Sequence, residues 1–263
     1  MCGLCAELCV AEIIKFDGDA PPNVPPEAER TCINCGQCVV FCPVSAVSLA
    51  AQPAAERVLV KPELMPALDS AETLLRSRRS VRRYVNEPLE EGTVRRLIET
   101  ARFAPSAVNR QPVRWLVTSG REKNLALGQL VVDFFNAQSR QQSQEGGELQ
   151  RAVYLTSRWK KGEDVIFRGA PQLAVAVIPK GYPFPEDGAM ALTYFELAAH
   201  SLGIGCCWAG FFTIAARQSA EIQHFLGVNE NEYVAGGQMF GRPDGLGLSR
   251  ILPPRKTPDI TLI

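Results

Sequence analysis

Cysteine thiolates are the side chains of this sequence with the clearest chemistry, and most of them lie within the first 42 residues. These are Cys2, Cys5, Cys9, Cys32, Cys35, Cys38 and Cys42. Closely spaced thiolates are soft ligands that suit iron–sulfur clusters or zinc. The other two, Cys206 and Cys207, are adjacent and typical of small buried apolar side chains. The start of the chain has no basic segment followed by an apolar run, so we expect a cytoplasmic protein with cysteines that bind metal.

The second cysteine run, with Pro43 after it, spells CxxCxxCxxxCP and resembles the run of bacterial ferredoxins without a mismatch. Zinc is the alternative. Structural zinc sites usually pair two separated CxxC units, and His200 and His224 are the only histidines, so iron and sulfur are favoured. In the two-cluster arrangement of those ferredoxins, the first three cysteines of this run share a cluster with Cys9. Cys42 then joins Cys2 and Cys5.

The first cysteine run repeats this spacing with one member absent, because the missing cysteine would fall two positions before Met1. It also has Val10 where the motif prefers proline. One hypothesis is that the natural chain begins a few residues upstream. The competing hypothesis is a genuine three-cysteine site that holds a three-iron cluster or takes a fourth ligand from elsewhere. We expect two 4Fe-4S clusters, one of them short of a ligand from the chain as given.

Three further segments favour an organic cofactor. The arginine-rich run RRSVRRY at 78–84 suits a phosphate monoester, because guanidinium groups bind phosphate oxygens in bidentate fashion. A solvated basic surface is the alternative for that run. PSAVNRQP at 105–112 forms a turn with exposed amides. LGIGCCWAG at 202–210 is a glycine-punctuated loop where backbone can approach a planar ligand closely, and Trp208 is either core or a wall of such a site.

Together these segments resemble the nitroreductase family of FMN-dependent oxidoreductases, in the subgroup with an N-terminal two-cluster ferredoxin domain. The resemblance covers residues 2–48 and 73–263. It implies that Arg78, Ser80 and Arg82 bind the FMN phosphate and ribityl chain. Arg79 adds contacts there, and Arg255, in the terminal PRK motif, closes on the phosphate.

The same resemblance assigns the flavin ring to residues of the other two segments, some of them from a partner subunit, which implies a homodimer. Pro105, Ser106 and Ala107 line the ring from the partner subunit, Asn109 and Gln111 shape the pocket, and the backbone amides of Ala209 and Gly210 face N5. The Asn and Lys that some members supply from the middle of the chain have no clear match. No side chain is expected to act as an obligatory acid or nucleophile, since the chemistry belongs to the cofactor.

The function implied is an FMN-dependent oxidoreductase. It receives electrons through iron–sulfur clusters or NAD(P)H, with reduced ferredoxin as a further donor, and reduces a small electrophilic organic substrate such as a nitroaromatic, quinone or activated alkene. Three alternatives stay open. They are an electron-transfer module that relays electrons to a protein partner, a flavin-dependent dehydrogenase and a zinc-binding adaptor without redox activity.

Composition excludes two classes of partner. Lys and Arg together number 28 and so do Asp and Glu, so no net field attracts nucleic acid or an anionic membrane. The longest apolar stretches, such as residues 173–178, fall far short of the ~20 residues that span a bilayer.

We expect an α+β protein: a nitroreductase-like α/β sandwich with a small bacterial-ferredoxin-like domain. The expected divisions are a ferredoxin-like domain at 1–50, a linker at 51–70 and the flavin domain at 71–263. Asp69 and Glu72 form a capping box that opens a helix through Leu75. The patterns further predict helices at 90–103 and 189–202, strands at 115–118, 173–178 and 233–240, and a mobile polar insertion at 138–149.

Overall fold

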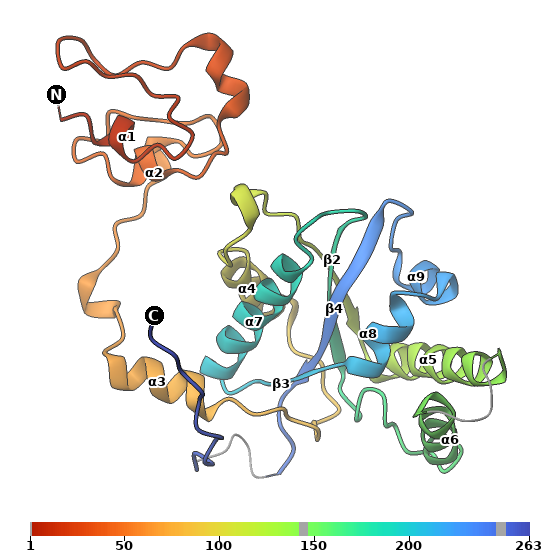
Figure 1. The fold of residues 1–263 in the computed structure, drawn as a ribbon. Helices are drawn as coiled ribbons and strands as arrows, with labels where there is room; N and C mark the ends of the chain where they lie inside the picture. The colour runs from red at the N-terminus through yellow and green to blue at the C-terminus, as the bar shows by residue number, and fades with distance from the viewer. Residues whose placement is uncertain (1, 142–146, 246–250) are drawn as a thin grey trace. The chain divides into compact units, whose positions relative to one another are not determined.

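A computed structural model describes residues 2–141, 147–245 and 251–263. The chain divides into two compact units, each described by itself here (Figure 1). The first comprises Met1–Pro66 with Ser106–Gln111, and the second Ala67–Pro105 with Pro112–Ile263. Among the helices described, none has the length and apolar character needed to cross a membrane.

The first unit is built of very short elements. They are the helices α1 (Leu4–Glu7) and α2 (Gln37–Val40) and the 3-10 turns η1 (Pro26–Thr31), η2 (Ala54–Glu56), η3 (Pro62–Leu64) and η4 (Ala107–Asn109). Its buried apolar residues are Ile13, Val39 and Cys42. One-turn helices are unstable alone, and so thin a core supplies little hydrophobic stabilisation, so metal ligation is the natural source of the remainder.

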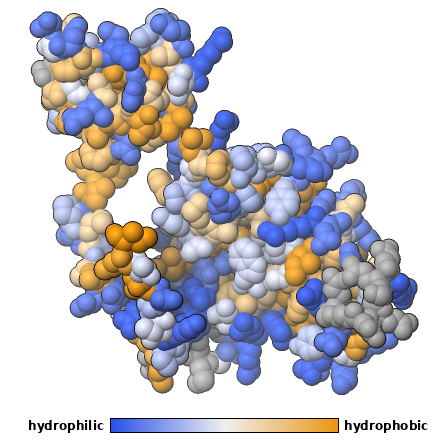
Figure 2. Space-filling model, in the orientation of Figure 1, coloured by the Kyte–Doolittle hydropathy of each residue, from blue (hydrophilic) through white to orange (hydrophobic). Residues whose placement is uncertain are grey.

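The connector at residues 51–66 follows the cysteine region of this unit and exposes apolar side chains. Val58, Leu59 and Val60 are 90%, 82% and 74% exposed. The connector therefore appears in orange in the hydropathy view (Figure 2). Its proline-rich sequence packs against no core.

An antiparallel four-stranded sheet with the order β1-β2-β4-β3 forms the centre of the second unit. Its strands are β1 (Arg114–Ser119), β2 (Gln172–Pro179), β3 (Gly205–Trp208) and β4 (Glu232–Gly241). β2 is buried almost throughout, because it pairs with β1 on one side and β4 on the other and is covered on both faces. Apolar side chains on both faces of a strand require helices on both sides of the sheet.

Those helices form the outer layers of an α/β sandwich (Figure 1). One face packs in a single core cluster with α5 (Arg121–Gln141), α6 (Gly147–Trp159), α8 (Gly210–Ala216) and α9 (Ala220–Leu226). The other face packs against α4 (Glu91–Ala101) and α7 (Glu186–Ser201), and α3 (Leu68–Ser77) contacts α7. Along β2, Leu173, Val175 and Val177 point to the α5 side, and the alternate residues point to the α4 and α7 side.

The structure confirms most of the expected elements, with three differences. The helix expected from Asp69 begins at Leu68 with Ala67 as its N-cap and has no side-chain cap, so the capping box is wrong and Asp69 lies within the first turn. There its charge favours the positive end of the helix dipole. The glycine-punctuated segment contains the edge strand β3, because its residues 205–208 pair in register with β4.

The polar insertion is the third difference. Residues 138–141 end the long helix α5, and α6 starts at Gly147. Residues 142–146 lie outside the described part of the chain, and with them the expected mobility. Polar residues at 138–141 continue a helix because it packs against α6 and the sheet, which outweighs local propensity.

Small residues allow α7 to pack closely on β4. A Cβ at Gly188 would meet the Cβ of Ala235 at 2.3 Å. Gly188→Ala therefore forces α7 away from the sheet, and we expect it to destabilise the second unit by about 1–3 kcal/mol although alanine is the better helix former. Gly92→Ala is the matched control, since Gly92 also lies in a first helical turn but has open space around it. Thermal unfolding followed by circular dichroism compares the two. A Gly188→Ala protein as stable as Gly92→Ala would contradict the packing argument.

Candidate functional site

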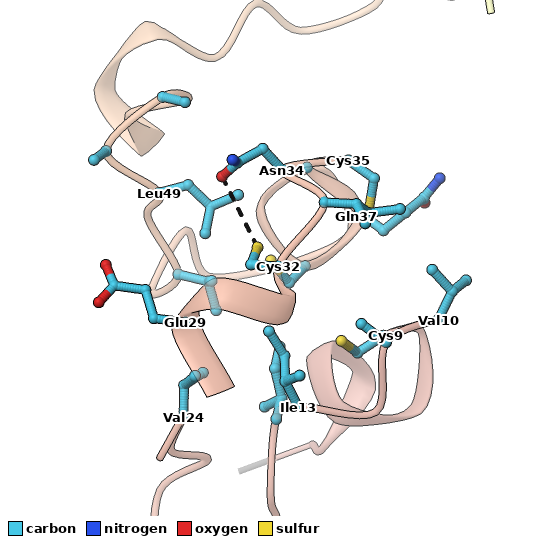
Figure 3. Close-up of a pocket in the computed structure, with 18 of the residues that line it drawn as sticks. Cys9, Val10, Ile13, Val24, Glu29, Cys32, Asn34, Cys35, Gln37 and Leu49 are labelled. Carbon is cyan, nitrogen blue, oxygen red and sulfur yellow. Dashed lines mark hydrogen bonds between the residues drawn. The ribbon is translucent and has the colours of Figure 1, made fainter. Parts of the chain in front are cut away.

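Four cysteines line one cavity in the first unit. The cavity has a volume of about 610 Å³, and its walls include Cys9, Cys32, Cys35 and Cys38 together with apolar residues such as Ile13. The close-up shows Cys9, Cys32 and Cys35 around this hollow (Figure 3). This is the set that the ferredoxin arrangement predicts for one cluster, drawn from both cysteine runs.

Each cysteine run makes the same turn. Cys2-Gly3 precedes α1 and Cys35-Gly36 precedes α2, and both glycines have left-handed backbone, with φ of 67° and 77°. A Cβ at Gly3 would meet Phe16 at 2.6 Å. The left-handed glycine starts the helix directly after Cys2 or Cys35. The next cysteine, Cys5 or Cys38, then follows within the first turn of that helix. The first unit is therefore an internal repeat of a Cys-Gly-x-Cys turn.

Cys42 lies apart from the cavity, buried among backbone donors. The N–H of Ala46 donates to its Sγ at 3.2 Å. Hydrogen bonds from the backbone N–H groups of Val44 and Ala46 lower the pKa of the Cys42 thiol, and the charge of Arg57 adds to the effect. In contrast, desolvation raises the pKa of the Cys38 thiol, and the charge of the neighbouring Cys35 raises it further.

The remaining two predicted ligands are more open. Cys2 is exposed and Cys5 half-buried, and neither lines the cavity. Within residues 2–141, 147–245 and 251–263, no three His, Cys, Asp or Glu side chains stand close enough to hold a single metal ion. In a 4Fe-4S cluster each thiolate binds a different iron, so its ligands stand farther apart than those of one ion.

The arginine-rich segment runs beside the edge strand of the second unit. The N–H of Val81 donates to the oxygen of Cys206 at 2.9 Å, and that of Val85 donates to the oxygen of Arg242 at 2.9 Å. A Cβ at Gly205 would meet Val81 at 2.6 Å, so glycine at 205 admits this segment. The sequence predicts that a planar ligand approaches the glycine-punctuated segment closely. At Gly205 the structure has Val81 of the same chain in that position.

The charges of two other guanidinium groups act on Arg79 in this segment. Burial, together with the positive charges of Arg255 and Arg78, lowers the pKa of Arg79. Arg78 also donates to the Oε1 of Glu196 at 2.8 Å, so its charge is partly balanced. Glu196 accepts from Gln238 at 3.0 Å through its other oxygen, which fixes its orientation. The charge of the tail residue Arg255 therefore acts on Arg79.

A second cavity of about 330 Å³ lies in the same unit. Its lining includes two predicted residues, Arg82 and Gly210, and two arginines that the sequence reading missed, Arg151 and Arg168. Arg151 comes from α6 and Arg168 from the loop before β2. No spacing rule connects them to the motif, because helix packing alone brings them together. Within the structure, the backbone marks Arg168 as unusual, because its φ is positive at 57°.

The loop at 106–111 is also strained. Val108, Asn109 and Gln111 have φ of 44°, 53° and 47°, uncommon for residues other than glycine. The Oγ of Ser106 accepts from the N–H of Gln111 at 2.9 Å and closes the loop. Strained loops concentrate at binding sites, so this geometry suits a loop that contacts a ligand.

The expectation for one amide needs correction. The N–H of Ala209 donates to the oxygen of Gly237 at 2.9 Å, so it is committed to β4. Gly210 is the first residue of α8, where backbone N–H groups have no partner within the helix, and it lines the cavity. Trp208, left open by the sequence, is 40% exposed and is a wall of this cavity.

His200 and the two remaining cysteines are part of the packing. Burial lowers the pKa of His200, so the imidazole is neutral at pH 7, and its Nε2 lies 2.7 Å from the Oγ of Ser77. Cys206 and Cys207 are 2% and 5% exposed. Desolvation raises the pKa of Cys206, which keeps it a thiol.

Comparison with known proteins identifies the family. Residues 75–242 match the model of the nitroreductase family, and residues 29–48 match that of the 4Fe-4S binding domain. The first match covers more than half of the chain, which therefore belongs to the nitroreductase family, a family of oxidoreductase enzymes. Its fold is the nitroreductase-like α+β fold with an N-terminal 4Fe-4S binding region, as expected.

Individual relatives agree with this assignment. The chain is 42% identical over 74 residues to an NADH dehydrogenase of Thermus thermophilus, a stretch of 26% of this chain and 36% of that protein. It is 25% identical over 175 residues, 65% of this chain and 83% of the other, to a protein of Archaeoglobus fulgidus named NADH dehydrogenase/NAD(P)H nitroreductase. The structure of a Bacteroides fragilis nitroreductase with bound FMN has a TM-score of 0.58 at 23% identity and covers 72% of this chain and 96% of its own.

The shared cavity generates a prediction for Cys9. If Cys9 and the second run bind the same cluster, Cys9→Ser and Cys35→Ser alter the same absorption and electron paramagnetic resonance signal after anaerobic reconstitution. Each loses up to about four irons per chain. Cys207→Ser, buried in the other unit, is the control and keeps the iron content of the parent. Two different signals lost in the Cys9 and Cys35 variants would refute the shared ligation.

Proposed function

We propose that this protein is an FMN-dependent oxidoreductase that takes electrons from NAD(P)H or from an iron–sulfur donor and reduces a small electrophilic organic substrate. The observation that carries the proposal is the anchoring of the arginine segment to β3 through Val81, which holds Arg78 and Arg79 where the charge of Arg255 acts on Arg79. Guanidinium groups repel one another, and Glu196 balances only Arg78 and only in part, so an arrangement of this kind favours a bound dianion such as a phosphate monoester. The relative with bound FMN and the one named for NAD(P)H support the choice of cofactor and donor.

Bound FMN would supply two-electron chemistry at its ring, and the chain would bind and orient it. We assign the phosphate and ribityl chain to Arg78, Arg79, Ser80 and Arg255. Arg82, first expected at the phosphate, and Arg168 would supply positive charge to the polar edge of the ring, and Gly210 lines the same cavity. Arg168 thereby fills the role for which the sequence offered no match.

We further propose that Pro105, Ser106, Ala107, Asn109 and Gln111 reach the ring of a partner subunit in a homodimer. The strained backbone of this loop is typical of a segment that contacts a ligand, which supports the proposal. No acid or base among the lining residues is needed, because water supplies protons to the reduced substrate. The substrate classes that fit are nitroaromatics, quinones and activated alkenes.

For the first unit we propose a ferredoxin-like domain at 1–50, joined by a linker at 51–70 to a flavin domain at 71–263. Cys9, Cys32, Cys35 and Cys38 would hold one 4Fe-4S cluster, which fits the cavity they line. Cys2, Cys5 and Cys42 would contribute to a second. A cluster carries one electron at a time, so the chain would collect single electrons for a two-electron cofactor.

Phosphate recognition can be tested with two ligands. We expect Arg79→Gln and Arg255→Gln each to raise the Kd of FMN about tenfold, since each removes a charged hydrogen bond to phosphate. Riboflavin lacks the phosphate, so its Kd changes little. Arg83→Gln is a control within the same motif, because Arg83 pairs instead with Asp244 and is 80% exposed. Fluorescence titration measures all three. An equal loss of riboflavin affinity would contradict phosphate binding by these residues.

The path of electrons can be tested by removing a cluster. The double variant Cys35→Ser, Cys38→Ser should lose flavin reduction by reduced ferredoxin and keep direct reduction by NAD(P)H. Anaerobic absorbance titration with NADH, NADPH and reduced ferredoxin in turn reads both reactions. Equal loss of both would refute the separate path. Flavin reduction without turnover of any nitroaromatic or quinone would favour the alternative that electrons pass to a protein partner.

A further inference from the structure

The cavity of about 330 Å³ carries more positive charge than the proposed cofactor uses there. Arg82, Arg151 and Arg168 line it, and its lining contains no Asp or Glu. Arg78, Arg79 and Arg255, assigned above to the single phosphate of FMN, are not among its walls. The flavin ring is uncharged when oxidised, and one or two cations at its polar edge suffice. Arg151 therefore contributes a positive charge beyond what the flavin ring needs.

Arg151 is the cation with no role so far. Its guanidinium carbon lies 5.6 Å from the ring centroid of Phe135, which is 4% exposed. A cation held against a buried aromatic ring is oriented without losing its charge. Among the salt bridges between described residues, none includes Arg82, Arg151 or Arg168.

Asp164 fixes the loop that carries Arg168, because its carboxylate binds backbone N–H groups of that loop. The carboxylate of Asp164 accepts hydrogen bonds from the N–H groups of Ile166, Phe167 and Gly169 at 3.1, 2.8 and 2.8 Å. It thereby holds the loop in place, and the left-handed Arg168 follows from that turn. The site has two preformed cations and a backbone that does not need to reorganise on binding.

The rest of the cavity wall is apolar, and two of its side chains, Trp208 and Phe211, are aromatic. Trp208, Phe211, Ile214 and Met239 line it beside the arginines. An occupant that matches both parts has a planar conjugated body and one anionic group. Bidentate hydrogen bonding makes arginine a good partner for a carboxylate.

We propose that Arg151 binds the carboxylate of the substrate, so that this enzyme prefers aromatic or conjugated carboxylic acids to their neutral analogues. The inference rests on the proposed function, since it names the substrate class of the same site. Arg151 acts as a specificity residue: it selects the substrate and takes no part in electron transfer.

The first test compares 4-nitrobenzoate with 4-nitrobenzamide, which differ in charge and little in shape. In the parent protein we expect the lower KM for the carboxylate. In Arg151→Gln the ratio of the two KM values shifts about tenfold against the carboxylate, and Arg151→Lys, which keeps the charge, recovers much of it. Arg158→Gln on the same helix is the control, because Arg158 pairs with Glu163 at 2.5 Å. An unchanged ratio in a folded Arg151→Gln protein overturns the proposal.

The second test does not depend on turnover. Isothermal titration calorimetry of the flavin-loaded protein measures the binding of benzoate and benzamide, neither of which is reduced. Benzoate should bind more tightly, and Arg151→Gln should remove that difference. If nitroarenes are not reduced but benzoate binds through Arg151, the proposed function fails and the anion site stands. If a neutral nitroarene is reduced and benzoate shows no preference, the function stands and this inference fails.

Two other outcomes assign the charge to a different anion and overturn the proposal. Loss of FMN from Arg151→Gln would make Arg151 part of the phosphate site. Weaker binding of NADPH relative to NADH, with an unchanged KM ratio, would make the 2′-phosphate of the nucleotide the ligand.

Discussion

The arrangement of the second unit, which we call the flavin unit, depends on backbone hydrogen bonds. These bonds hold the arginine-rich segment against β3 and the end of β4. Val81 and Val85 donate to Cys206 and Arg242, and Gly205 provides the space for Val81. Because the segment is fixed at both ends, its arginines have defined positions relative to the sheet. Without that anchor, charged side chains on a loop would disperse into solvent, where mutual repulsion favours separation. The orientation of Arg78 by Glu196, itself held by Gln238, extends the same constraint into the core.

The two units solve the problem of stability differently. The flavin unit buries both faces of β2 beneath helices, so hydrophobic burial holds it together. The first unit, which contains the cysteine runs, has one-turn helices and few buried apolar residues. Its backbone path therefore depends on the glycine turns and on the positions of the thiols. The cavity between its two cysteine runs is therefore a central feature of the unit. In such a domain ligation and folding are coupled, and the ligand set determines the backbone path.

Positive charge in the flavin unit is divided between two places. Arg78, Arg79 and Arg255 gather near the anchored segment, and Arg82, Arg151 and Arg168 line a cavity with an apolar wall. The separation matters for the two proposals, which assign the phosphate of FMN to the first group and a carboxylate on a planar body to the cavity. A neutral net charge for the whole chain is compatible with this division, since local potential depends on the nearest groups.

The sequence by itself determined the features that depend on local spacing. The CxxCxxCxxxCP run, the apolar strand at 173–178, the helix at 90–103 and the arginine motif were all readable, because helix periodicity, strand burial and ligand spacing act over a few residues. It missed β3, whose strand character comes from pairing with β4, and the helical ends of the polar insertion, which depend on packing against neighbours. Only the tertiary structure placed Arg151 and Arg168 beside Arg82 and committed the Ala209 amide to Gly237. These relations join segments far apart in the chain, and their proximity follows from how helices and strands pack, which no local pattern encodes.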